Sequence, residues 1–421
     1  ASIFLLLGIS ARPEKANDGN PLLVSIAAKD DTLRLVQLMF RHGDRNPIIT
    51  LPNDPENQRA SWPGGLGELT HRGARQEYRL GKWLRTRYGN YMGEEYDSRT
   101  IYVRSTDFNR TIMSAQANMA GFFSPSDEER VEDDVKWRPI PIHSIPSWAD
   151  TKLNMDIPCP KFDSETVSYF EQLSQLTEED QETIRYIAEK TNDSHVSYID
   201  HFLLLDLIRS ELYHNDTHTI PKWMNATIYK RIEKLNNDAN MYAFRTEKSK
   251  RLKGGLIAQE ILERFTNKSR GDYSMLKMYA YSAHDMNMYT LLATLGIHLD
   301  HMPHFATVLM MELHERNGDN YVEMFFKNET DVDNVFELEI PGCGKPCRVL
   351  APYKVADWDA ECGIEKPRSA LWIIVLLLAL AQLLFIVVVV GGIIAISRWN
   401  LAKERRKTAS ERPLDVYLQR L

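Results

Sequence analysis

The stretch 33–47 reads Leu-Arg-Leu-Val-Gln-Leu-Met-Phe-Arg-His-Gly-Asp-Arg-Asn-Pro. Its first part alternates and then runs apolar, which predicts a β-strand over residues 32–40. The charged segment 41–45 therefore begins where this strand ends. Ligands of open α/β sheets bind beyond the carboxyl ends of the strands, so we expect this segment to lie in a binding site.

Arg41 and Arg45 flank His42 in this segment, and Gly43 lets the backbone pass close to a ligand. Guanidinium groups bind phosphate oxygens in pairs, and a neutral imidazole can attack phosphorus to form a phosphohistidine. Positive neighbours lower the pKa of a histidine, so we expect His42 to stay neutral at acid pH. The competing interpretation is a surface turn with scattered charges.

Two later segments place further polar residues just past predicted strands. Arg104 follows a strand expected over 101–103, and His284 and Asp285 follow one expected over 278–282. Together the three strand ends would bring six side chains to one rim: Arg41, His42, Arg45, Arg104, His284 and Asp285. This set supplies a nucleophile, a clamp for three phosphoryl oxygens and a proton donor, and it requires no metal ion or other cofactor.

Predicted strands and helices alternate at both ends of the chain, whereas the middle is helical. The further elements expected are strands over 306–314 and 320–327 and helices over 163–190, 195–214, 224–245 and 249–266. This pattern predicts an α/β domain made of residues 31–139 and 251–362, with a smaller, mainly helical cap domain inserted at 140–250.

Three motifs in this order resemble those of the histidine acid phosphatase family. They are R-H-G-D-R-x-P at 41–47, R-S-T-D-x-x-R-T at 104–111 and S-A-H-D at 282–285, within a resemblance that covers about 32–362. The resemblance implies a phosphoglycerate-mutase-like central sheet flanked by helices, and a cofactor-free, dimeric acid phosphatase that tartrate inhibits. It also implies that His42 is the phosphorylated nucleophile and that Asp285 protonates the leaving alcohol. The phosphate would be held by Arg41, Arg45, Arg104 and His284.

Two other functions remain open. A mutase-like enzyme shares the R-H-G motif and the phosphohistidine but keeps the phosphoryl group for a second acceptor, so the identity of the acceptor distinguishes it. A non-catalytic membrane glycoprotein receptor is the other, but a protein that only binds has no need of all six residues. The substrate expected is a small-molecule or protein phosphomonoester, and the sequence does not specify it further.

The C-terminal part contains a predicted transmembrane helix at 370–397. No charged residue occurs in it, and ~20 apolar helical residues are enough to cross a bilayer. The tail 398–421 has seven Lys or Arg and three Asp or Glu, so the positive-inside rule places it in the cytosol. Residues 1–11 look like a signal-peptide remnant, and 12–30 look like a spacer. We therefore expect a single-pass type I membrane protein with a lumenal or extracellular active site.

The net charge of the chain indicates which partners to expect, and the cytosolic tail indicates its destination in the cell. A net charge of −7 argues against a nucleic-acid partner, which would need a basic face. The segment Tyr417-Leu418-Gln419-Arg420 has an arginine where a tyrosine sorting signal needs a bulky apolar residue. Lysosome and cell surface are therefore both open destinations.

The cysteines and sequons fit an exported chain. Four cysteines allow three pairings, and the turn Gly344-Lys345-Pro346 makes Cys343–Cys347 with Cys159–Cys362 the economical one. The resemblance implies the same two disulfides, although six cysteines are expected in the lysosomal branch. Glycans are expected at five sequon asparagines, Asn192, Asn215, Asn225, Asn267 and Asn328, and Asn109-Arg110-Thr111 also fits the sequon formally.

Other residues that attract notice have simpler explanations. His298, His301 and His304 have a zinc-like spacing, but the turn residues between them favour a surface loop. Trp137 and His143 lie in a proline-rich stretch, where packing in the core is the default and a dimer contact is the alternative.

Overall fold

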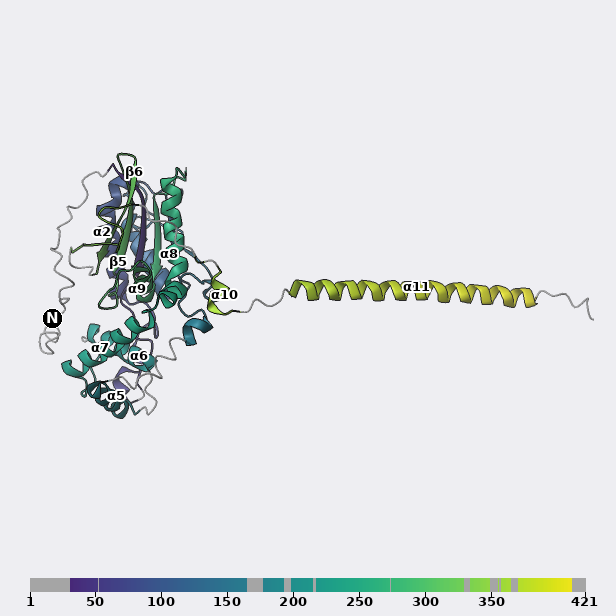
Figure 1. The fold of residues 1–421 in the computed structure, drawn as a ribbon, viewed down its shortest axis with the longest axis horizontal. Helices are drawn as coiled ribbons and strands as arrows, with labels where there is room; N and C mark the ends of the chain where they lie inside the picture. The colour runs from purple at the N-terminus through teal and green to yellow at the C-terminus, as the bar shows by residue number, and fades with distance from the viewer. Residues whose placement is uncertain are drawn as a thin grey trace, which may run out of the picture. The chain divides into compact units, whose positions relative to one another are not determined.

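The computed structural model of the chain describes residues 31–51, 53–164, 177–192, 198–214, 217–272, 274–328, 334–348, 355, 357–364 and 370–410. The chain divides into two compact units, one ending at Gly363 and the other beginning at Ile364. The first unit contains a sheet with flanking helices, and the second contains one long helix (Figure 1).

The first unit is built on an eight-stranded sheet. Its strands are β1 (Leu33–Arg41), β2 (Ile101–Ser105), β3 (His143–Ser144), β4 (Met278–Ala283), β5 (Val308–Arg316), β6 (Asp319–Lys327), β7 (Phe336–Leu338) and β8 (Cys347–Arg348). The order across the sheet is β3-β2-β4-β1-β5-β6-β7, and β8 pairs with β6. Strands β3, β2, β4 and β1 run parallel. The carboxyl ends of β1, β2 and β4 therefore lie at the same edge, as predicted for the strands that carry the site.

Four helices cover the two faces of this sheet: α2 (His71–Met92), α3 (Asn109–Phe122), α8 (Glu247–Ser269) and α9 (Asp285–Thr294). Leu38 and Phe40 of β1 pack on the face covered by α2 and α3, whereas Met39 packs on the face covered by α8 and α9. A strand covered on both faces is apolar at successive positions, which explains the apolar run of β1. Each fully buried side chain of this kind contributes about 1.5–3 kcal/mol to stability.

Strands β5 and β6 form the predicted antiparallel pair. The turn between them places Asn317 and Gly318 at φ values of 55° and 83°. Positive φ at both central residues suits the right-handed twist of a tight hairpin, and Asn-Gly is the pair that tolerates it best.

A smaller group of helices forms the cap: α5 (Glu178–Thr191), α6 (Tyr198–Tyr213) and α7 (Ala226–Ala243). The cap has an apolar core of its own, in which Ile187 packs in one cluster with Leu51 from the loop after β1. Helix α5 begins at Glu178, where Thr177 and Asp180 form a capping box, and residues 165–176 of the predicted helix lie outside the described part of the chain. Strand β3 pairs with β2, so the predicted cap boundary at residue 140 lies before a strand of the sheet.

Two disulfides join Cys159 to Cys362 and Cys343 to Cys347, as expected. The first links the end of the short helix α10 (Trp358–Cys362) to a cysteine 203 residues earlier. A cross-link that closes so long a loop restricts the unfolded chain and thereby stabilises the folded one.

The sequon asparagines differ in exposure. Three are exposed, as a glycan requires: Asn192, Asn225 and Asn267. Asn328 is only 8% exposed, and its amide nitrogen lies 3.1 Å from Nε2 of His301. Asn328 is thus less accessible than the other three, and the glycan expected there stays a prediction. Asn215 lies outside the described residues.

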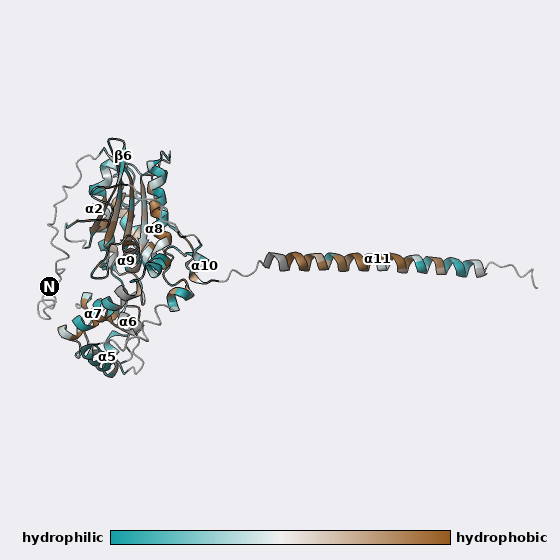
Figure 2. Cartoon of the chain, in the orientation of Figure 1, coloured by the Kyte–Doolittle hydropathy of each residue, from teal (hydrophilic) through white to brown (hydrophobic). Residues whose placement is uncertain are grey.

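Helix α11 (Ala370–Ser410) forms the second unit. Its segment Ile374–Thr408 is long and apolar enough to cross a membrane, and Figure 2 shows the apolar first part in brown. The predicted span 370–397 lies within this helix, which continues through the basic residues to Ser410. Since a helix rises 1.5 Å per residue, this length exceeds the ~30 Å of a bilayer core.

Candidate active site

The segment predicted to bind phosphate leaves β1 between its two neighbouring strands. The backbone nitrogen of Arg41 donates to the Thr307 carbonyl at 3.0 Å, and that of His42 donates to the Ala283 carbonyl at 3.1 Å. A Cβ on Gly43 would lie 2.3 Å from the carbonyl oxygen of Gly73 in α2. Only glycine fits at residue 43, so the first turn of α2 presses directly on this loop and fixes its path.

His42 is 2% exposed at the carboxyl end of β1. Its Nδ1 lies 2.8 Å from the Gly43 carbonyl oxygen, which can only accept, so Nδ1 carries the proton and Nε2 keeps its lone pair. Burial lowers the pKa of His42 well below its usual value, and the charges of Arg41 and Arg110 lower it further. The lowered pKa favours the neutral form of the imidazole in acid solution.

His284 and Asp285 lie at the end of β4, next to His42. The rings of His42 and His284 are 5.4 Å apart, and Nε2 of His284 lies 3.0 Å from Oγ1 of Thr106. Burial lowers the pKa of His284 well below its usual value, and the nearby arginines, Arg110 first, add to this. Asp285 begins α9 and pairs with Arg41 at 2.9 Å. The structure thus brings the two histidines and Asp285 together, as the sequence predicts.

Arg41 and Arg45 are each held by groups behind the site. Arg41 donates to the Pro303 carbonyl at 2.6 Å, and its guanidinium lies 4.3 Å from the centre of the Phe305 ring. Arg45 forms an ion pair with Asp206 at 2.8 Å. The Nε of each arginine is buried without a hydrogen-bond partner. A buried donor without a partner is costly, and the phosphoryl oxygens of a substrate would satisfy it.

Arg104 does not join this group, and its predicted role as a phosphate ligand is not supported. Its NH2 forms an ion pair with Asp150 at 2.5 Å, and its NH1 lies 3.7 Å from Glu260 of α8. Arg104 is opposite Tyr281 in the pairing of β2 with β4, and the Tyr281 hydroxyl donates to Glu260 at 2.7 Å. Residues paired in this way project from the same face of the sheet, so Arg104 points toward α8 and away from the histidines.

Arg110 takes the place that the sequence analysis gave to Arg104. It lies in the first turn of α3, its guanidinium is 4.7 Å from the Phe108 ring, and its charge lowers the pKa of both His42 and His284. Burial, together with Arg45, lowers the pKa of Arg110 itself to about 10. Among the described residues, Arg110 has no carboxylate partner, unlike Arg41, Arg45 and Arg104.

The sequence contains a feature that could have identified Arg110. Arg110 is the second arginine of the motif R-S-T-D-x-x-R-T, and it falls where a helix begins. A cation is unfavourable at a helix N-terminus, where the helix dipole is positive, unless an anion binds there.

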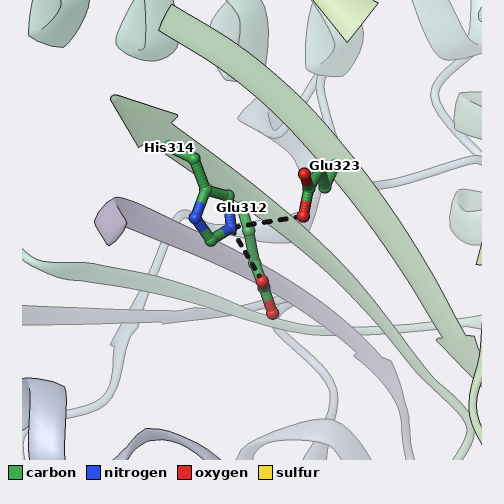
Figure 3. A group of neighbouring side chains, drawn as sticks. All are labelled: Glu312, His314 and Glu323. Atoms are coloured by element: carbon green, nitrogen blue, oxygen red, sulfur yellow. Dashed lines mark hydrogen bonds and ion pairs between the residues drawn. The ribbon is translucent and has the colours of Figure 1, made fainter. Parts of the chain in front are cut away.

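One other cluster of titratable residues has ligand atoms close enough to hold a metal ion: Glu312, His314 and Glu323 (Figure 3). Nε2 of His314 lies 3.1 Å from Glu312 and 3.6 Å from Glu323. Arg87 and Tyr88 also donate to Glu312, at 2.8 Å and 2.5 Å. These donors outweigh burial and lower the pKa of Glu312. The carboxylates are neutralised by protein cations, so the cluster suits a structural role better than a metal.

The zinc-like histidines form no metal group among the residues that the structure describes. His301 bonds to its neighbour Asp300 and to Asn328. His304 is exposed in this loop. The loop interpretation of these histidines fits their positions between α9 and β5.

Comparison with known proteins agrees with this geometry. A sequence model of the histidine phosphatase superfamily (branch 2) matches residues 32–327, and the chain belongs to this superfamily. It is 38% identical to acid phosphatase 5 of Caenorhabditis elegans over 364 residues, 84% of each chain. It is 31% identical to human lysosomal acid phosphatase over 414 residues, 92% of this chain and 91% of that protein. The chain is accordingly an acid phosphatase, a hydrolase of phosphate monoesters.

A solved structure shares the fold. The apo form of Hafnia alvei phytase matches with a TM-score of 0.57 at 16% identity, covering 80% of this chain and 97% of that one. At this identity the match shows the architecture alone. The expected α/β fold, with its mixed sheet and flanking helices, is confirmed.

Proposed function

We propose that this protein is a membrane-anchored acid phosphatase that works through a phosphohistidine on His42. The observation that carries the proposal is the state of His42: its Nδ1 proton is committed to the Gly43 carbonyl at 2.8 Å, which leaves the Nε2 lone pair free. Three arginines lower the pKa of His42 through their charge, and the Nε of each is buried without a hydrogen-bond partner: Arg41, Arg110 and Arg45. Such positive groups stabilise the charge that a phosphoryl group spreads over its oxygens in the transition state.

In the first step Nε2 of His42 attacks phosphorus and the bond to the ester oxygen breaks. Asp285 gives its proton to the departing oxygen, so an alcohol leaves and the carboxylate remains. A phosphate dianion bound beside Asp285 favours the protonated carboxyl that this step needs. In the second step water attacks the phosphohistidine, its proton passes to Asp285, and the P–N bond breaks. The enzyme is then restored and inorganic phosphate leaves.

The test is hydrolysis of p-nitrophenyl phosphate by the full chain in detergent micelles, from acid to neutral pH. His42→Ala should abolish turnover while leaving the melting temperature near that of the wild type. His298→Ala, which changes an exposed histidine in the same unit, is the matched control and should keep full activity. Full activity of His42→Ala would refute the proposed nucleophile.

The anchor is the second part of the proposal. Helix α11 passes from an apolar segment into the basic residues after Ser397, which supports a type I orientation with a cytosolic tail. The active site would then face the lumen or the cell exterior, in a lysosome or at the cell surface. Protease treatment of sealed microsomes should remove only the tail. Glycan-dependent mobility should decrease when Asn192, Asn225 and Asn267 are changed to Gln together.

The third part is a homodimer formed at the β3 edge of the sheet. Packing of Trp137 and His143 in the core is not observed: Trp137 is 44% exposed, and Trp148 nearby is 81% exposed. His143 stacks on the ring of Tyr102 at 4.4 Å, which makes an aromatic surface beside an edge strand. Aromatic surfaces and open strand edges are typical of protein contacts. Sedimentation should show a dimer that Trp148→Ala weakens, whereas a monomeric wild type would refute this part.

A further inference from the structure

Helix α6 of the cap contacts the loop that carries His42. Three residues in its second half or just after its end share the contact: Asp206, Tyr213 and His214. They are spaced i, i+7 and i+8, and such residues lie on one face of a helix. None of these residues belongs to the motifs of the sequence analysis, and the contact joins two parts of the first unit that are distant in sequence.

Both carboxylate oxygens of Asp206 bind the guanidinium group of Arg45. One oxygen accepts from NH1 of Arg45 at 2.9 Å, and the other lies 2.8 Å from NH2. The same carboxylate accepts from the backbone nitrogen of Ile48 at 3.1 Å, so it also holds the loop. Although burial alone would lower the pKa of Arg45, the pairing with Asp206 raises it. The side of the guanidinium formed by Nε and the second hydrogen of NH2 is then left for another acceptor.

His214 contacts Asp44, which precedes Arg45 in the loop that carries His42. Its Nε2 lies 2.8 Å from Oδ2 of Asp44, which is fully buried. Thr70, the cap of α2, donates to the same oxygen at 2.6 Å, and the Asp44 nitrogen donates to Gln76 at 2.8 Å. Asp44 is thus fixed from α2 on one side and from the cap on the other.

Tyr213 makes the third contact, through Phe305. The two rings are 5.8 Å apart, and the Phe305 ring packs against Arg41 at 4.3 Å. The face of α6 therefore reaches Arg41, Asp44 and Arg45, which are three of the five residues of the loop. The nucleophile lies between them.

We propose that α6 is a positioning element for the phosphate site, with Asp206 acting through Arg45 and His214 acting through Asp44. The inference rests on the proposed function in one respect, that Arg45 binds the phosphoryl group. Asp206 does not touch the substrate; it turns the free side of the Arg45 guanidinium toward the position of the phosphate. A misplaced clamp lowers affinity even when every charged group is still present.

A double-mutant cycle on phosphate affinity tests this assignment. The four proteins are the wild-type full chain in detergent, Asp206→Ala, Arg45→Ala and the double variant, each titrated with inorganic phosphate by calorimetry. Asp206→Ala should weaken phosphate binding about 10- to 100-fold in the wild type and have no further effect in Arg45→Ala. Equal losses in both backgrounds would overturn the inference. Because binding is measured, the cycle does not depend on turnover, whereas failure of the proposed function would show as an inactive wild type.

Two further measurements separate positioning from simple stabilisation of the cap. Tyr186→Phe removes a hydrogen bond from Tyr186 to the Trp223 carbonyl within the cap and touches no loop residue, so it is the matched control. It should lower the melting temperature without changing phosphate affinity. Asp206→Asn keeps the side-chain size and one acceptor, so it should fold and recover part of the affinity lost in Asp206→Ala. An Asp206→Asn protein with wild-type affinity would overturn the inference, as would a loss of affinity in Tyr186→Phe.

Discussion

Two clusters of buried charge lie at opposite ends of β5, and their cations are paired to different extents. Val308, at one end of β5, pairs with Phe40, next to the loop 41–45 that carries His42. His314, toward the other end, pairs with Leu33 at the start of β1. In the His314 cluster Glu312 pairs with Arg87 and Glu323 pairs with Arg316, and Figure 3 shows how His314 lies between the two glutamates. At the catalytic end Arg110 has no carboxylate among the described residues, and the Nε atoms of Arg41 and Arg45 have no acceptor.

This difference in pairing predicts that the His314 cluster supports stability and that the cluster around His42 supports function. A buried ion pair whose partners are all present costs little, whereas breaking it leaves an unpaired buried charge. A buried cation without a carboxylate partner, such as Arg110, and buried guanidinium nitrogens without acceptors are costly in the free protein, and an anionic ligand relieves that cost. Changes at the catalytic end should therefore alter activity first, and changes at the His314 cluster should alter stability first.

The largest effect is expected at the catalytic end, from Asp285→Asn. The amide cannot supply a proton, so esters of poorly leaving alkyl alcohols should be hydrolysed about 10²–10⁴-fold more slowly. Activated aryl esters need less help from an acid and should lose much less. Comparing kcat for glycerol phosphate and p-nitrophenyl phosphate measures this contrast, and equal losses on both would show that Asp285 is not the acid.

Arg110→Ala should have the next largest effect. It removes the unpaired cation near both histidines, and the loss of one such group costs about 10²–10³-fold in kcat/KM. Arg104→Ala is the matched comparison, because Arg104 is paired with Asp150 and should affect the melting temperature more than catalysis. The reverse order of the two losses in kcat/KM would mean that Arg104 binds phosphate and Arg110 does not.

Glu312→Gln should have the opposite character. The change removes the charge that Arg87 and His314 share, which should cost about 3–5 kcal/mol of unfolding free energy. Catalysis should be unchanged at temperatures where the variant is folded. Chemical denaturation measures the first effect and steady-state kinetics the second, and a large change in kcat would remove the distinction between the two clusters.

The smallest effect is expected at Glu211, a buried carboxyl group of the cap. It has no cationic partner among the residues that the structure describes. Burial and the neighbouring Asp54 raise its pKa to about 8. The folded protein then holds a proton that the unfolded chain releases above about pH 4.5, so stability falls as pH rises from there to about pH 8. Glu211→Gln cannot ionise, so its melting temperature relative to the wild type should rise from pH 5 to pH 8. An offset that does not change with pH would argue against a protonated Glu211.

The sequence was sufficient for the parts of the site that depend on local pattern. The apolar run before Arg41 predicts β1, and the rule that ligands bind at strand ends places His42, His284 and Asp285 correctly. Side chains of β1 pack on both faces of the sheet. The continuous apolar run of this strand indicates such two-sided packing.

The parts that failed depend on direction and on long-range contacts. Whether Arg104 points to the histidines or to α8 is decided by its pairing with Tyr281, which is far away in sequence. Asp206 was not found because its role requires the cap to be docked on the catalytic loop. The sequon at Asn328 is present, but only the fold shows that this residue is 8% exposed and bonded to His301.

The central claim is that a phosphoryl group resides on His42 during turnover. The most direct measurement is rapid acid-free quenching of the enzyme with a ³²P-labelled aryl phosphate, followed by peptide mapping of the acid-labile label. The account predicts label on the peptide that contains His42, transfer of that label to water, and no label in His42→Ala. Label that persists in His42→Ala would contradict the account, and label that passes to an organic acceptor instead of water would indicate a mutase.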